Sequence, residues 1–162
     1  MHSLDDAGVY FSEVVEPTAT EFFGTPSSFR TALALATVLF HAHEWLWEFN
    51  RTDLEAEFST AFPSAWKWWK FVEAQVPEAR FIRDLANASK HVRLTLKPST
   101  SMTHIANTSI QSTGFGEGGF GAGRYGGGPN VTMKDGADDV SFDDCANNLL
   151  AFWRPLVAKL YA

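Results

Sequence analysis

The sequence lacks most of the features that stabilise or direct a protein outside the cell. It contains one cysteine, Cys145, so no disulfide can form within the chain, which is typical of a reducing compartment. The N-terminal stretch is acidic and has no apolar core of the kind found in signal peptides. The longest apolar stretch, from about Leu33 to Phe49, is interrupted by His41, Glu44 and other polar residues, which predicts a buried helix and no membrane span. We therefore expect a cytoplasmic protein.

The common signatures of nucleotide-hydrolase and zinc sites are absent as well. The sequence has no G-x-x-x-x-G-K-[ST], no H-E-x-x-H and no C-x-x-C, so we expect neither a metal nor a cofactor. A formal G-x-G-x-x-G occurs at Gly114, Gly116 and Gly119, but glycines continue after it and no helix follows. We interpret residues 114–128, of which nine are glycine, as a flexible glycine-rich loop.

Apolar and aromatic side chains, in contrast, are abundant. Hydrophobic residues make up 45% of the 162 residues, and there are 14 Phe, 6 Trp and 3 Tyr. This composition predicts one globular domain over residues 1–162, long enough to bury a core without disulfides or metals. Aromatic residues are also enriched in the cores of interfaces, and their number here predicts a homodimer.

Charge is spread unevenly along the chain. The net charge is −6; residues 1–62 contain ten acidic and two basic residues, whereas residues 67–97 contain seven basic and three acidic ones. The overall charge disfavours general nucleic-acid binding, but the basic segment leaves RNA open as a partner. The alternative interpretation is that the basic segment simply faces the acidic N-terminal half.

Apolar residues at helical spacing predict a mainly α protein. The clearest helix covers about residues 26–51, with Thr25 as its cap and two apolar stripes that give it a central position. We expect an acidic connection over 52–62, an aromatic helix over 63–76 and a further helix over about 77–92.

The two ends of the chain also have helical patterns. A short helix is expected over residues 4–15, closed by Pro17. The last helix is predicted by the capping-box pattern Ser141-x-x-Asp144 before an apolar run, with Pro155 kinking it or loosening one turn.

A small β element is predicted near the C-terminal end. Residues 130–134 and 139–142 indicate two strands joined at an Asp-Gly turn, and residues 93–97 and 102–112 have a β-leaning composition. The expected fold is thus a helical bundle with a small antiparallel β-hairpin and a glycine-rich arm.

The most specific polar pattern lies in the helix expected over 77–92. At about 100° per residue, Asp84, Asn87 and His91 share one edge near its end, beside Lys90, and Arg83 lies about 80° away. A histidine at a helix C-terminus tends to keep its proton, so this edge could transfer protons or hold a phosphate. The alternative is that these side chains bond buried backbone groups.

A second polar stripe lies on the central helix. His41, Glu44 and Glu48 share one face there, as a metal site or an acid–base pair requires. A solvated polar face is the alternative interpretation. His43 lies on an apolar stripe and is expected to be a hydrogen-bonded core residue.

Three stretches together resemble the HEPN domains. They are HAHEWLWEFNR, FIRDLANASKHVRLT and DGADDVSFDDCANNLLAFWRPLV, and the resemblance covers most of the chain from about Pro26 onward. It implies a helical bundle that pairs into dimers and, in many members, a metal-independent ribonuclease of toxin, phage-defence or RNA-processing systems. Arg83 and Asp84 would match the first two motif positions and His91 the last, although six residues separate Asp84 from His91, more than the family usually shows.

Two hypotheses about function follow. The first is a metal-independent ribonuclease in which His91 helps the RNA 2′-hydroxyl attack and Arg83 stabilises the developing charge. The second is a non-catalytic dimeric binding or interaction module for RNA or an unknown protein partner. An open cleft at Arg83 and His91 would favour the first, and burial would favour the second. The candidate catalytic residues are His91, Arg83, Asp84 and Asn87, and the supporting residues are Lys90, Glu44 and His41.

Overall fold

The computed structural model describes residues 6–90, 100, 104–111 and 129–162. The expected glycine-rich loop at 114–128, the β-leaning segment at 93–97 and the candidate residue His91 lie outside these described residues.

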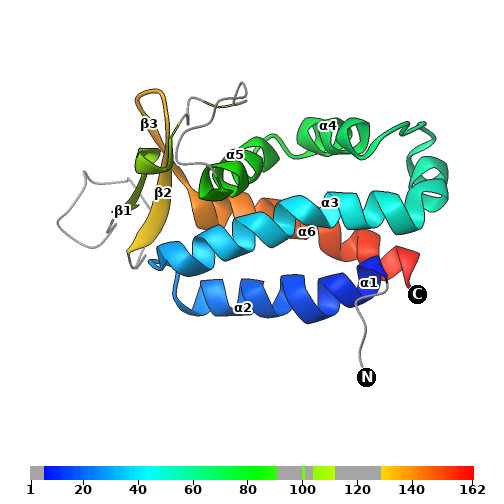
Figure 1. Ribbon diagram of the computed structural model, residues 1–162, viewed down its shortest axis with the longest axis horizontal. Helices are drawn as coiled ribbons and strands as arrows, with labels where there is room; N and C mark the ends of the chain where they lie inside the picture. The colour runs from blue at the N-terminus through cyan, green and yellow to red at the C-terminus, as the bar shows by residue number, and fades with distance from the viewer. Residues whose placement is uncertain (1–5, 91–99, 101–103, 112–128) are drawn as a thin grey trace.

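The described chain is mainly α-helical, as the sequence predicts, with a small antiparallel sheet at one end (Figure 1). The long helices α3 and α6 lie at the centre, with α1 and α2 along one side and α4 and α5 along the other. Helices and strands follow in the order α1 (Ala7–Tyr10), π-helix η1 (Phe11–Val15), α2 (Glu16–Gly24), α3 (Phe29–Phe58), α4 (Ala65–Gln75), α5 (Ala79–Lys90), 3-10 helix η2 (Ile105–Asn107), β1 (Thr108–Gln111), β2 (Asn130–Asp135), β3 (Asp138–Ser141) and α6 (Phe142–Leu160).

The N-terminal helix does not end at Pro17, which corrects the sequence prediction. Helix continues through the proline, because the backbone changes to π-type hydrogen bonding just before it and Glu16 N–H donates to the carbonyl of Phe11. Pro17 then falls in the first turn of α2, where its missing N–H is tolerated. A π-bulge thus lets the helix pass through a residue that normally stops it.

The central helix α3 is longer than predicted and begins later. Its N-cap is Ser28, whose hydroxyl accepts from Thr31 N–H at 3.3 Å, and not Thr25. Asn50 has non-helical backbone angles (φ −127°, ψ 20°), which marks a kink close to the predicted end. The helix then resumes to Phe58 through the segment expected to be a connection, because Leu54 is fully buried there.

The hairpin is confirmed. Strands β2 and β3 pair with Asp135 opposite Asp138, and Gly136 has the positive φ of 66° that the tight turn requires. Strand β1 adds to the other edge of β2, so the sheet has the order β1-β2-β3. It is tied to the helices by an Arg80–Asp135 ion pair at 3.2 Å.

Helix α6 begins where the sequence predicts, but not with a capping box. Ser141 is the N-cap residue, yet its side chain makes no cap hydrogen bond; its hydroxyl donates to the Asp143 carboxylate and accepts from Asn130 at 2.7 Å. The helix runs through Pro155 to Leu160.

Ten of the aromatic side chains that motivate the homodimer prediction are buried inside one chain. Trp68, Trp69 and Trp153 are fully buried, and rings from α3, α4 and α6 pack around Trp68. The homodimer therefore stays a prediction. Helix α3 packs extensively against α5, which brings the two polar patterns identified in the sequence into one region.

Candidate functional site

The polar stripe of α3 meets the end of α5 in a chain of three side chains. His41 Nδ1 lies 2.7 Å from Glu44 Oε2, one turn further along α3. On the other side of the ring, His41 Nε2 lies 2.8 Å from Lys90 Nζ, the last residue of α5. The contact is half open to solvent, since the side chain of His41 is 27% exposed and that of Glu44 is 54% exposed.

The hydrogen-bond partners fix the state of the His41 imidazole in this arrangement. An ammonium group can only donate, so Lys90 makes Nε2 the acceptor and Nδ1–H the donor to Glu44. A carboxylate that holds one ring nitrogen while the other keeps its lone pair is the arrangement of an oriented general base. Lys90 places a positive charge next to that lone pair. This cluster can therefore move a proton and hold an anion.

The two predicted catalytic residues at the start of the motif occupy a different, buried environment. Arg83 donates to Asp84 Oδ1 from Nε at 3.1 Å and from Nη2 at 2.9 Å, and to Glu73 Oε1 from Nη1 at 2.7 Å. The side chains of Arg83, Asp84 and Glu73 are only 7%, 2% and 9% exposed. The Arg83 guanidinium also lies over the indole of Trp66, with its Cζ 5.5 Å from the centroid of that ring.

The two carboxylates of this buried network have further donors. Asp84 Oδ2 accepts from Thr100 through the backbone N–H at 2.9 Å and the hydroxyl at 2.8 Å. Glu73 accepts from Trp69 Nε1 at 2.7 Å and pairs with Lys70. The network therefore ties α4, α5 and Thr100 together.

Sequence reasoning places these residues only in part. Asp84 lies on α5 but is buried and does not face solvent, and His91 of the expected polar edge lies outside the described residues. Asn87 is half-buried one turn further along α5. The structure joins Lys90, His41 and Glu44, whereas Arg83 is enclosed by carboxylates and buried among the described residues. Glu48 is exposed beyond Glu44 and takes no part in the His41 contact.

Glu73 and Thr100 are the members that sequence reasoning missed. Trp69 and Glu73 stand four residues apart on the aromatic helix, which places the carboxylate beside an indole N–H. That spacing was the available signal for Glu73. Thr100 meets Asp84 only through the tertiary fold, so no local pattern indicates it.

The metal alternative for the α3 stripe has no geometric support. Within residues 6–90, 100, 104–111 and 129–162, no group of three or more His, Cys, Asp or Glu side chains is placed to hold a metal ion. The acid–base alternative has the His41–Glu44 contact in its favour.

The prediction that His43 is a hydrogen-bonded core residue is confirmed. His43 is buried, its Nδ1 bonds the carbonyl of Phe40, and its ring lies 4.9 Å from that of Trp69. Burial lowers its pKa below the ordinary 6.5, and this outweighs the opposing effects of the Phe40 carbonyl and the Glu44 carboxylate. His43 therefore stays neutral at neutral pH and cannot replace His41 as an accessible proton acceptor.

No family model, curated protein or solved structure matches this chain. No helix in the described part of the chain is long and apolar enough to cross a membrane.

Proposed function

We propose that this protein is a HEPN-like, metal-independent ribonuclease whose proton transfer is centred on His41. The single observation that supports this proposal is the His41 ring held between Glu44 and Lys90, from two helices and at a half-open surface. His91, the predicted catalytic histidine, follows Lys90 directly in the sequence.

The proposed reaction is cleavage of RNA by its own 2′-hydroxyl. Lys90 first turns its ammonium group from His41 Nε2 to the phosphate, which frees the Nε2 lone pair. His41 Nε2 then takes the 2′-hydroxyl proton, O2′ attacks the neighbouring phosphorus, and the bond from phosphorus to O5′ breaks. His91 gives a proton to the leaving O5′, so the products are a 2′,3′-cyclic phosphate and a 5′-hydroxyl. Lys90 stabilises the negative charge that builds up on the phosphate oxygens.

In this proposal Arg83 and Asp84 act through position and do not contact the substrate. The Arg83 guanidinium is already shared by two carboxylates, so it has little positive charge to offer a phosphate. The buried network instead fixes α5 against α4, and Lys90 at the end of α5 depends on that placement. This role differs from the one that the HEPN resemblance implies for Arg83.

The test is cleavage of a short single-stranded RNA by the purified chain in the presence of EDTA. We expect a 2′,3′-cyclic phosphate product, and a rate about 10²–10⁴-fold lower for His41→Gln and for His91→Gln. Lys90→Gln is compared with Lys67→Gln, which removes an equal charge from an exposed position on α4. Loss of cleavage in Lys90→Gln alone supports the site, whereas equal loss in both variants indicates general electrostatics.

Absence of cleavage by the wild-type chain over a range of salt concentrations overturns the ribonuclease proposal. The second candidate function, a non-catalytic dimeric binding module, then remains. The enclosure of Arg83 by Glu73 and Asp84 supports this alternative, because a guanidinium paired with two buried carboxylates is typical of a structural role. Light scattering at tens of micromolar protein tests the homodimer that both functions include; a monomer contradicts it.

A further inference from the structure

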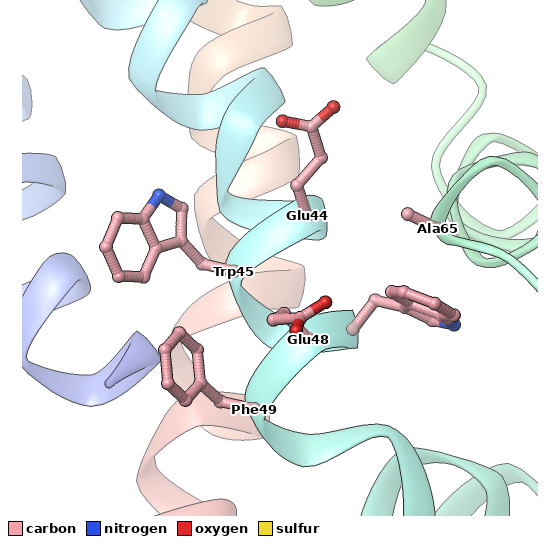
Figure 2. Close-up of a pocket in the computed structure, with 6 residues that line it drawn as sticks. Glu44, Trp45, Glu48, Phe49 and Ala65 are labelled. Atoms are coloured by element: carbon pink, nitrogen blue, oxygen red, sulfur yellow. The ribbon is translucent and has the colours of Figure 1, made fainter. Parts of the chain in front are cut away.

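A surface beyond the His41–Lys90 contact runs along the second half of α3. It is a shallow depression of about 460 Å³ lined by Glu44, Trp45, Trp47, Glu48, Phe49 and Ala65. Figure 2 shows the two carboxylates pointing outward between an aromatic pair on one side and Ala65 on the other. We call it the acidic–aromatic surface.

The aromatic side of this surface is a fixed stack. Trp45 lies between Tyr10, at 4.7 Å and 8° between the ring planes, and Phe49, at 5.7 Å and 14°. The Tyr10 hydroxyl donates to the carbonyl of Val38 at 3.1 Å, which anchors the inner end of the stack. Phe49 forms the outer end and is 48% exposed, although it is large and apolar. A partner at this end would meet a rigid ring and would lose little freedom by ordering it.

The acidic side is a stripe parallel to the stack. Glu44 and Glu48 are one turn apart, as are Trp45 and Phe49, so carboxylates and rings form two adjacent rows on α3. Glu48 makes no ion pair with any side chain in the described part of the chain. Its charge is therefore open to a partner.

At two places on or near this surface the same combination of ring and carboxylate is already completed by a cation. Arg51 lies over Trp47 at 5.5 Å and donates to Glu55 at 3.0 Å. Arg83 lies over Trp66, also at 5.5 Å, and donates to Glu73. At Phe49 and Glu48 the described residues supply the ring and the carboxylate but no cation.

We propose that the acidic–aromatic surface binds an arginine- or lysine-bearing segment of another protein. One cationic side chain would lie along Phe49 with its charge beside Glu48, because an aromatic face and a carboxylate both attract a guanidinium or ammonium group. The binding of such a segment does not require the ribonuclease proposal to hold.

The charge of the surface argues against two other occupants. The phosphates of an RNA strand lying along Phe49 would be repelled by the Glu48 carboxylate, which has no cation beside it as Glu44 has in the His41–Lys90 contact. A second copy of the chain related by a two-fold axis would place the same patch against itself, and so Glu48 close to Glu48. A basic peptide satisfies both the carboxylates and the rings.

The experiment measures fluorescence anisotropy of a labelled peptide of alternating arginine and glycine with the full chain. We expect Glu48→Gln and Phe49→Leu each to weaken binding about two- to fivefold, since exposed ion pairs and cation–π contacts are modest. Phe49→Leu keeps an apolar side chain and removes the ring, and the exposure of Phe49 makes it a mild change for folding. Asp53→Asn is the matched control, because Asp53 is an exposed acid on the same helix.

The same titration contains the outcomes that would overturn the proposal. If Asp53→Asn weakens binding as much as Glu48→Gln, the peptide follows net charge and not this surface. If a single-stranded RNA of similar length competes for the site, or if Phe49→Leu converts a dimer into a monomer, the occupant is RNA or a second copy. Glu48→Gln leaves His41, Glu44 and Lys90 in place, so RNA cleavage by that variant tests the ribonuclease proposal separately.

Discussion

Two ionic clusters in this molecule use the same kinds of side chain in opposite surroundings. The Glu73–Arg83–Asp84 network is buried, and its guanidinium donates to both carboxylates. The His41–Glu44–Lys90 contact is half open to solvent, and each partner of the imidazole contributes a single contact. The first cluster joins helices α4 and α5, whereas the second lies where α5 ends beside α3.

The difference separates a structural role from a chemical one. Charges that are removed from water must be paired and hydrogen-bonded, so each group in the buried cluster depends on the others. An exposed ion pair contributes little to stability, because water already solvates both groups. A histidine at such a surface remains accessible from solvent. Arg83 and Asp84 thus belong to the buried cluster, and His41 belongs to the surface cluster on which the ribonuclease proposal centres its proton transfer.

The sharpest way to break this comparison is to remove the guanidinium from the buried network. Arg83→Met should lower the free energy of unfolding by about 3–5 kcal/mol, because Glu73 and Asp84 would be left as buried carboxylates without their shared partner. Arg83→Lys keeps the charge but loses the forked donor geometry, so its free energy of unfolding should lie between those of the wild type and Arg83→Met. Urea unfolding of the three proteins measures the order.

A matched control for this prediction is the exposed pair of Arg154 and Glu16. Arg154 donates to both carboxylate oxygens of Glu16, at 2.8 and 2.9 Å, yet its side chain is 50% exposed. Arg154→Met should therefore cost no more than about 1 kcal/mol. Similar losses in Arg83→Met and Arg154→Met would show that burial does not separate the two classes of ion pair.

The sequence predicts the helical elements and the hairpin because their signals are local. The apolar stripes of α3 and the Asp-Gly turn before β3 each depend on residues within a few positions of one another. The errors have physical causes, one in the backbone and one in the packing of the core. Pro17 does not end the helix because a π-bulge precedes it. Helix α3 continues past Asn50 because the side chain of Leu54 is buried in the core there.

The sequence indicates several residues of the candidate site, but not which of them come into contact across helices. Helical spacing places His41 beside Glu44 on α3, and the structure has the two side chains in contact. Helical spacing does not indicate that Glu73 reaches Arg83 from α4, or that Lys90 reaches His41 across 49 residues, because these contacts depend on how helices pack. The burial of Arg83 follows from the same packing.

A pH titration sharpens the comparison through His43, which lies between the two clusters. Its folded-state pKa is lowered by burial, so the unfolded chain binds a proton at a higher pH than the folded chain. The stability that His43 supports is fully present above its ordinary pKa of about 6.5 and is lost as pH falls below it, by at most about 1.4 kcal/mol per pH unit. His43→Gln removes this titration. The free energy of unfolding of this variant, measured with urea, should therefore fall less between about pH 7 and about pH 5.5 than that of the wild type. Equal slopes would show that His43 does not titrate on unfolding.

The smallest effect on stability is expected in the His41–Glu44–Lys90 contact. The ribonuclease proposal predicts a large effect on the rate of RNA cleavage there. Glu44→Gln should change the free energy of unfolding by no more than about 0.5 kcal/mol, because the His41–Glu44 pair joins residues one turn apart on one helix in contact with water. If His41 is the proton acceptor, the same variant should slow RNA cleavage, because the carboxylate that holds its Nδ1–H in place is gone. Glu48→Gln, one turn away, is the control that removes an equal charge and should keep the cleavage rate. Measured side by side, unchanged stability with reduced cleavage in Glu44→Gln alone separates a reactive cluster from a structural one. A loss of stability close to that of Arg83→Met would place both clusters in the same structural role.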